Sequence, residues 1–225
     1  MKRRRKPLKH IRPRLFDSMH VWPLVGIDEV GTGCVAGPIA AAGVVLPKDE
    51  AVLDALELAG LKDSKQMTAM ARERVSEIIT EHATFCVVEY IHPRELEQLG
   101  QGPALDKMFN AIMAAFRLRF KRGGSIVLDG NYRKNLDYFH VAVHQGDQKS
   151  LAIAAASVVA KVARDKFMEE YEDASGYGFA KHKGYLTKDH QDALEKLGVS
   201  DMHRRNVRPI QVLLAKDEQS LGVAS

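Results

Sequence analysis

Three apolar segments of this chain end on, or just before, an acidic residue, and no other feature constrains its fold as strongly. The segment "PLVGI" leads to Asp28 and Glu29, "SIVLD" ends on Asp129, and Asp147 comes shortly after "YFHVAVH". Acidic residues are rare in strands, and a charge beside a core is costly unless something pairs with it. We therefore expect a sheet whose strand ends bring these acids together.

Clustered carboxylates repel one another unless they are protonated or bridged by cations. A set of oxygen ligands without His or Cys favours Mg²⁺ or Mn²⁺, and such ions suit displacement at phosphorus. The pattern therefore predicts a divalent-metal site made by Asp28, Glu29, Asp129 and Asp147. For each acid alone the simpler interpretation is a solvated strand edge or a turn, as in "LDGN".

The hydrophobic pattern predicts a mixed α/β sheet domain with helices gathered late in the chain. Apolar segments bounded by Gly and Pro indicate strands within 22–28, 36–47, 83–91, 125–129 and 138–144. Apolar residues at three- and four-residue steps indicate a helix over 105–120. Further helices are expected at 68–82, capped by Thr68, at 150–171, and from about residue 187. The alanines of the 150–171 helix would let it pack closely on the sheet.

Positive charge is concentrated at the start of the chain. Residues 1–16 hold eight of the 33 Lys and Arg and no acid, which leaves 25 basic against 29 acidic residues elsewhere. The rest is therefore formally −4 although the whole chain is +4. A basic arm of this kind either binds phosphate backbones or is a merely solubilising extension. We expect a disordered arm over 1–20, a catalytic domain with C-terminal helices over 21–215, and a tail over 216–225.

Cysteine content and hydropathy favour a soluble, cytoplasmic protein. The two cysteines, Cys34 and Cys86, lie far apart and in no metal-ligand spacing, which suits a reducing compartment. The small-apolar run from Leu151 is too short to span a bilayer, and Lys161 interrupts it. The basic start lacks the apolar core of a secretory signal. We therefore expect no membrane association.

Six blocks of this sequence, in order, resemble the ribonuclease HII family. They are "GIDEVGTGCVAGP", "LKDSKQM", "LDGN", "GDQKSLAIAAASVVAKVARD", "YGFAKHKGYLT" and "HRR", and they extend from about Val25 to Arg208. The resemblance implies a ribonuclease H-like fold, a mixed β-sheet flanked by helices, here with a C-terminal helical extension. It implies cleavage of the RNA strand of RNA–DNA hybrids and incision 5′ of ribonucleotides embedded in duplex DNA, leaving 3′-hydroxyl and 5′-phosphate ends. A monomer is expected.

The resemblance also assigns roles to individual residues. Asp28, Glu29, Asp129 and Asp147 correspond to the catalytic acids, which bind Mn²⁺ or Mg²⁺ in a two-metal mechanism. The stretch Gly31–Thr32–Gly33 corresponds to a Gly-Arg-Gly stretch that approaches the ribonucleotide and its 2′-hydroxyl. Tyr185 corresponds to a tyrosine that stacks on the neighbouring sugar, and Lys65 is expected to reach a phosphate. Without the resemblance, Tyr185 reads as a half-buried aromatic and Lys65 as a surface lysine.

Two details of the sequence leave alternatives open. Thr32 replaces the family arginine, which is harmless if the backbone makes the contact and weakens binding if the guanidinium grips a phosphate. Side chains of adjacent strand residues point to opposite faces, so Glu29 needs a bend at Val30–Gly31 or acts through its main-chain carbonyl. Asp165 also fits the family pattern, but its spacing from Lys161 favours a structural ion pair.

Three classes of function remain on the sequence alone. The first is a metal-dependent ribonuclease HII, and the second is a nucleic-acid-binding protein on the same fold with activity weakened by Thr32. The third is a two-metal phosphodiesterase that acts on DNA. Four clustered carboxylates would repel DNA phosphate and give a pure binder no benefit. Tyr185 and the glycines argue against the third class.

Overall fold

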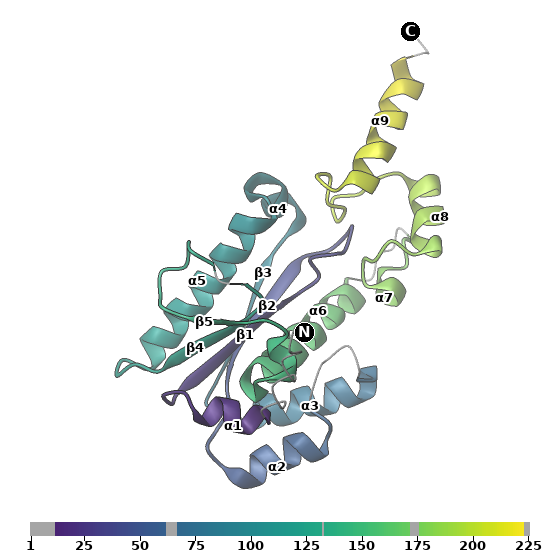
Figure 1. The fold of residues 1–225 in the computed structure, drawn as a ribbon. Helices are drawn as coiled ribbons and strands as arrows, with labels where there is room; N and C mark the ends of the chain where they lie inside the picture. The colour runs from purple at the N-terminus through teal and green to yellow at the C-terminus, as the bar shows by residue number, and fades with distance from the viewer. Residues whose placement is uncertain (1–11, 62–66, 132, 172–175, 223–225) are drawn as a thin grey trace, which may run out of the picture.

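A computed structural model describes residues 12–61, 67–131, 133–171 and 176–222. Its centre is a five-stranded sheet in the order β3-β2-β1-β4-β5 (Figure 1). The strands are β1 Leu24–Val30, β2 Ile39–Val45, β3 Phe85–Ile91, β4 Ser125–Asp129 and β5 Val141–Val143. β1, β2 and β3 pair antiparallel, whereas β4 pairs parallel with β1 and β5 parallel with β4. This mixed sheet confirms the fold class expected from the sequence.

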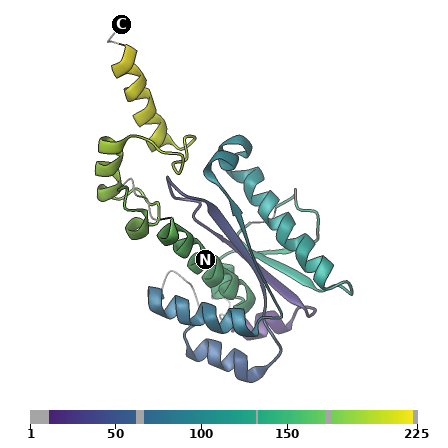
Figure 2. The same ribbon diagram turned by 180° about the vertical axis from the view of Figure 1, so that it is seen from behind.

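Helices cover both faces of the sheet, and the C-terminal ones extend beyond it (Figures 1 and 2). α5 packs on one face, and α6, α3 and α2 lie on the other. α7, α8 and α9 follow α6 away from the sheet, as the predicted C-terminal extension requires. The bounds are α1 Pro13–Ser18, α2 Glu50–Leu58, α3 Ala69–His82, α4 Pro93–Leu99, α5 Gln101–Arg119, η2 Gly146–Gln148, α6 Leu151–Glu170, α7 Phe179–His182, α8 Lys188–Leu197 and α9 Arg208–Gly222.

Successive residues of β1 face two different hydrophobic cores, one on each side of the sheet. Val25 and Ile27 pack with α5 in one hydrophobic cluster, while Gly26 faces α6. A Cβ atom at Gly26 would lie 2.1 Å from the backbone carbon of Ala152, so this glycine lets the helix approach the strand. Four alanines of α6 are buried in the second cluster, which confirms the close packing expected from the sequence: Ala154, Ala155, Ala156 and Ala160. As a result, Asp28, two residues after Gly26, also faces α6.

Most predicted elements occur at the expected places. α3 begins after Thr68, whose hydroxyl accepts a hydrogen bond from the Ala71 N–H, and β4 has the predicted bounds. β5 is shorter than the 138–144 expected, because it is an edge strand whose only partner in the ladder, β4, ends at Asp129. The sequence reading missed α2, where Asp49 caps a short helix by accepting from the Ala51 and Val52 N–H groups.

Part of the predicted arm is ordered. Residues 13–18 form α1, in which Arg14 pairs with Glu50 and Asp54 of α2 at 2.9 and 2.5 Å. Asp17 accepts a hydrogen bond from the Ala152 N–H at the start of α6. The disorder predicted for 1–20 is therefore wrong for this segment, because tertiary contacts stabilise a helix too short to form alone. Residues 1–11 lie outside the described residues, and the predicted boundary at residue 215 falls inside α9.

No helix in the described part of the chain is both long and apolar enough to cross a membrane.

Candidate functional site

Three of the four predicted acids lie near one another, where β1 and β4 end. Ile27 pairs with Leu128 in the parallel ladder, so Asp28 and Asp129 follow side by side on neighbouring strands. Asp28 is buried and hydrogen-bonded to Ser157 of α6. A carboxylate oxygen of Asp129 accepts the Gly146 N–H at 2.6 Å, which holds η2 and its buried Asp147 beside β4.

The environment of Asp28 opposes a negative charge. Burial raises the pKa of its carboxyl well above the usual range, and the charges of Glu29 and Asp129 raise it further, against the hydrogen bonds from Ser157 and the Glu29 N–H. A bound divalent cation would reverse this effect by favouring the ionised carboxylate. A donor set made only of carboxylates, with mutual repulsion at its centre, fits Mg²⁺ or Mn²⁺ chemically.

The Glu29 side chain leaves β1 on the opposite face from Asp28, although its charge acts on the Asp28 carboxyl. β1 stays regular through Val30, with Glu29 opposite Ala41 and Val30 opposite Ala40, so strand alternation directs Glu29 to the face away from Asp28. The bend comes only at Gly31, where φ is +88°. Within residues 12–61, 67–131, 133–171 and 176–222, no three His, Cys, Asp or Glu side chains lie close enough to hold an ion. The acids therefore lie in one region but do not form a complete set of metal ligands in this structure.

A tight turn follows β1 and carries the predicted recognition residues. The Cys34 N–H donates to the Gly31 carbonyl at 3.2 Å, which leaves Thr32 and Gly33 at the tip of the turn. Gly33 is exposed, and an added Cβ atom there would meet nothing within 4 Å. A Cβ atom at Gly31 would instead lie 2.2 Å from Nε of the buried Arg164. Gly31 therefore allows close packing against Arg164, whereas Gly33 leaves space at the exposed tip of the turn.

The predicted Tyr185 lies beside this turn. The Gly184 carbonyl accepts hydrogen bonds from the Val35 and Ala36 N–H groups at 3.0 and 3.3 Å, which joins the two loops. The Tyr185 ring is 43% exposed, and its hydroxyl contacts the Cys34 thiol. Burial raises the pKa of that hydroxyl, with the neighbouring thiol as the next cause. The structure thus brings Gly31, Thr32, Gly33 and Tyr185 together.

Two lysines named from the sequence have different outcomes. The Lys161 ammonium lies 5.7 Å from the centre of the Tyr185 ring and 2.7 Å from an Asp165 carboxylate oxygen. This contact confirms the ion pair predicted from their spacing. Lys65 lies outside the described residues.

Sequence reasoning missed two buried arginines that join the loops. Arg164 is fully buried, and its guanidinium donates to the carbonyls of Pro38 at 2.8 Å, Lys183 at 2.9 Å and Ala36 at 3.2 Å. Arg204, also buried, donates to the Gly37 carbonyl at 2.9 Å. A signal for Arg164 exists in the sequence, because it is four residues from both Ala160 and Met168 on the buried stripe of α6.

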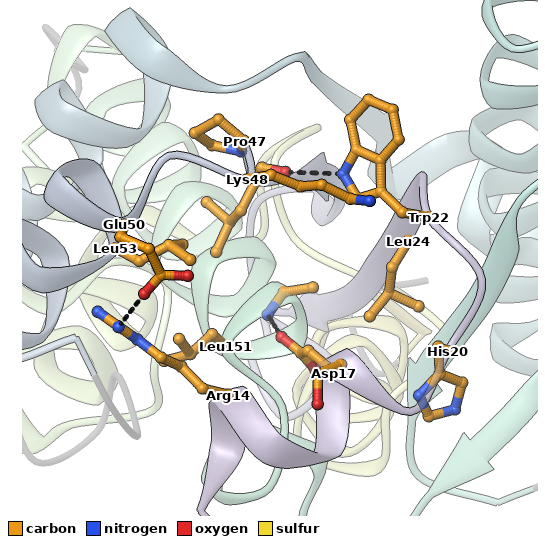
Figure 3. Close-up of a pocket in the computed structure, with 13 residues that line it drawn as sticks. Arg14, Asp17, His20, Trp22, Leu24, Pro47, Lys48, Glu50, Leu53 and Leu151 are labelled. Carbon is orange, nitrogen blue, oxygen red and sulfur yellow. Dashed lines mark hydrogen bonds and ion pairs between the residues drawn. The ribbon is translucent and has the colours of Figure 1, made fainter.

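A separate cavity of about 380 Å³ lies between α1, the end of β2 and the start of α6 (Figure 3). Asp17, Trp22, Leu24 and Lys48 are among its lining residues. Burial raises the pKa of Asp17 to about 6, against hydrogen bonds from Ser150 and Ala152. This cavity borders Leu24 at the beginning of β1, whereas the acids lie near the end of that strand, so the two places are distinct.

Comparisons with known proteins agree with this arrangement. The family model described as Ribonuclease HII matches residues 25–209. Ribonuclease HII of Francisella philomiragia is 38% identical over 192 residues, which cover 85% of this chain and 99% of that protein. In the solved PCNA:RNase HII complex from Archaeoglobus fulgidus, one chain is 25% identical with a TM-score of 0.67, over 82% of this chain and 95% of that one.

A further solved structure, Bst-RNase HIII in complex with Mn²⁺, is 18% identical with a TM-score of 0.68, over 92% of this chain and 75% of that one. At this identity the likeness shows the fold alone. The family match spans the positions of the acids, the glycine turn and Tyr185, and the Francisella relative covers most of the chain. The family predicted from the sequence is confirmed, and the chain belongs to the ribonuclease HII family.

Proposed function

We propose that this chain is a metal-dependent endoribonuclease that cuts the RNA strand of RNA–DNA hybrids and incises 5′ of ribonucleotides embedded in duplex DNA. The products would be 3′-hydroxyl and 5′-phosphate ends. The observation that carries the proposal is the juxtaposition of two features. Acids on β1, β4 and η2, of which Asp28 and Asp147 are buried, lie at one end of the strands, and β1 leads directly into a glycine turn with an exposed tip beside Tyr185.

The acids supply the ligands for the proposed chemistry. Asp28, Asp129 and Asp147 would hold divalent ions through their carboxylates, and the direction of the Glu29 side chain favours a role for its main-chain carbonyl. When bound, Mg²⁺ or Mn²⁺ would activate a water molecule and stabilise the leaving 3′-oxygen. The hydroxyl of Ser157 and the N–H of Gly146 orient the Asp28 and Asp129 carboxylates before any ion binds.

The turn and Tyr185 supply recognition. The exposed backbone of Thr32 and Gly33 would approach the ribose, whose 2′-hydroxyl is the chemical difference between RNA and DNA. The half-exposed Tyr185 ring would stack on the adjoining sugar. Arg164 and the Gly184 carbonyl join the two loops by hydrogen bonds. The groups that contact the ribose and the ring that stacks on the sugar would therefore keep a fixed position relative to each other.

Thr32 supports a second candidate, a binding protein with weakened activity. A threonine at the turn tip offers backbone groups but no guanidinium for a phosphate. The enzyme is favoured because Asp28, Asp129 and Asp147 lie in one region, where the charge of Asp129 adds to the burial that opposes an ionised Asp28 without a cation. We also propose that the protein works as a monomer.

Cleavage of three end-labelled duplexes with Mg²⁺ or Mn²⁺ tests the proposal. The duplexes carry a single ribonucleotide in DNA, an RNA–DNA hybrid, and DNA only. We expect cleavage of the first two, abolished by a chelator, and none of the third. Cleavage of the DNA duplex would favour the phosphodiesterase, and binding without cleavage would favour the binder.

A further inference from the structure

Three buried histidines from separate segments meet behind the Tyr185 loop. His182 ends α7, His190 lies on α8, and His203 precedes the buried Arg204; their exposed fractions are 7%, 0% and 1%. The rings of His182 and His190 stack with centroids 4.1 Å apart. His190 and His203 face each other through their Nε2 atoms at 3.0 Å.

The partners of the rings fix where each proton lies. The Ser200 N–H donates to His203 Nδ1 at 3.0 Å, so the proton of a neutral His203 is on Nε2 and is donated to His190. His190 in turn donates from Nδ1 to the Tyr185 carbonyl at 2.9 Å. A one-way chain of hydrogen bonds therefore runs from Ser200 through His203 and His190 to Tyr185.

The third ring is satisfied in the same way. His182 accepts the Gly184 N–H on Nδ1 at 3.2 Å and donates from Nε2 to the Tyr177 carbonyl at 2.9 Å. All six ring nitrogens have partners when the three rings are neutral, which leaves no ring nitrogen for a metal ion. Burial, together with the neighbouring His190, lowers the pKa of His203 to about 4. His203 is therefore neutral at physiological pH.

The hydrogen-bond chain ends at the Tyr185 peptide, and the backbone around this peptide has an unusual conformation. Lys183, next to Gly184, has φ +53°, a conformation that is uncommon outside glycine. The Tyr185 N–H donates to the His182 carbonyl, and its carbonyl accepts from both Thr187 N–H and His190. Tyr185 is 43% exposed, so packing restrains its side chain only in part and the backbone contributes to its direction.

We propose that His190 and His203 are positioning residues that hold Tyr185 in the orientation needed to read the ribonucleotide junction. The inference rests on the proposed function, in which Tyr185 contacts the substrate. Neither histidine touches the acids or the reacting phosphate. Their role is to fix the peptide whose side chain recognises the substrate.

Isosteric amides separate this role from simple core packing. The amide nitrogen of Asn takes roughly the place of a histidine Nδ1, and that of Gln roughly the place of Nε2. His190→Asn therefore keeps the donor to Tyr185. His190→Gln loses that donor and can keep only the contact with His203, by turning its amide oxygen to accept from His203 Nε2. At position 203 the preference reverses, because His203→Gln keeps the donor to His190 and His203→Asn loses it.

We would measure kcat and KM for each variant on the single-ribonucleotide duplex at pH 7.5 or above, and hydrogen exchange over residues 183–188 without substrate. His190→Gln loses one buried hydrogen bond, which should raise KM about three- to tenfold. Hydrogen exchange over residues 183–188 should also become faster in this variant. His190→Asn should stay within about twofold of the natural protein. At position 203 the Asn variant should show the larger rise and the Gln variant the smaller.

The same pair at position 190 is then repeated in a Tyr185→Ala background. There His190→Gln should add no further rise in KM, although exchange still increases. Equal effects of Asn and Gln at both positions, or the same KM rise with and without the Tyr185 ring, would overturn the inference. If Tyr185→Ala alone leaves KM unchanged while the exchange pattern is as expected, the recognition role assigned to Tyr185 in the proposed function is what has failed.

Discussion

Gly31 and Gly33 are two residues apart in one turn, yet the structure gives them opposite sensitivities to an added methyl group. Gly31 has φ +88°, and a Cβ atom there would lie 2.2 Å from Nε and 2.7 Å from Cδ of Arg164. Arg164 cannot retreat cheaply, because its guanidinium donates to three backbone carbonyls. At Gly33 the space is open and no positive φ is imposed.

These differences convert into free energies of unfolding. Left-handed backbone costs a residue with a Cβ atom about 1–2 kcal/mol, and overpacking a filled interior adds about 1–3 kcal/mol. Gly31→Ala should therefore destabilise the protein by about 2–5 kcal/mol, or roughly 4–20 °C in Tm for a chain of this size. Gly33→Ala should stay within about 0.5 kcal/mol, as ordinary surface changes do.

Thermal unfolding without nucleic acid, together with KM on the single-ribonucleotide duplex, distinguishes the two variants. Gly31→Ala should lower Tm, whereas Gly33→Ala should leave Tm unchanged and raise KM, because its methyl group would stand between the backbone and the ribose. Equal Tm values for the two variants would refute the structural role of Gly31. An unchanged KM for Gly33→Ala would refute the close approach at the turn tip.

Three further predictions follow from the charges. Asp129→Asn should lower cleavage by orders of magnitude while Tm without metal holds or rises, because Asp129 helps raise the pKa of Asp28; near-normal cleavage would contradict the acid site. Deleting residues 2–11, which spares α1, should flatten the salt dependence of duplex binding with little change in kcat, and identical salt slopes would show that the arm is no anchor. His203 binds a proton more readily unfolded, at its ordinary pKa of 6.5, than folded, at about 4. Stability should therefore fall by up to ~3 kcal/mol as pH drops through this window, and denaturant titrations of His203→Gln should show a flatter profile than the natural protein.

Strand periodicity accounts for what could be predicted. Apolar segments ending in acids placed Asp28 and Asp129 together, since parallel neighbouring strands bring their ends to one edge. The same alternation left two roles open for Glu29, and the regular pairing through Val30 favours the main-chain carbonyl. Element bounds were good where a cap or a Gly–Pro boundary marked them, as at Thr68 and in β4.

The parts that escaped prediction depend on contacts between distant segments. Arg164 and His203 carry polar side chains that sequence statistics place at the surface, yet both are buried. Arg164 donates to a backbone carbonyl far along the chain, and His203 pairs with His190 of α8. α1 is likewise held by Arg14 and Asp17 through α2 and α6. Arg164 does lie on the buried stripe of α6, but the partners of all these side chains leave no periodic mark in the sequence.

The position of incision on a duplex with one ribonucleotide tests the central claim most directly, because Thr32 stands where the family has an arginine. Thr32 keeps its backbone N–H and C=O at the turn tip, so we expect the natural protein to cut 5′ of the ribonucleotide. Thr32→Arg should lower KM without moving the cut, since one charge-assisted phosphate contact contributes roughly 1.5–3 kcal/mol. No cleavage by the natural protein, restored by Thr32→Arg, would contradict the account and make this chain a nucleic-acid binder on a ribonuclease fold.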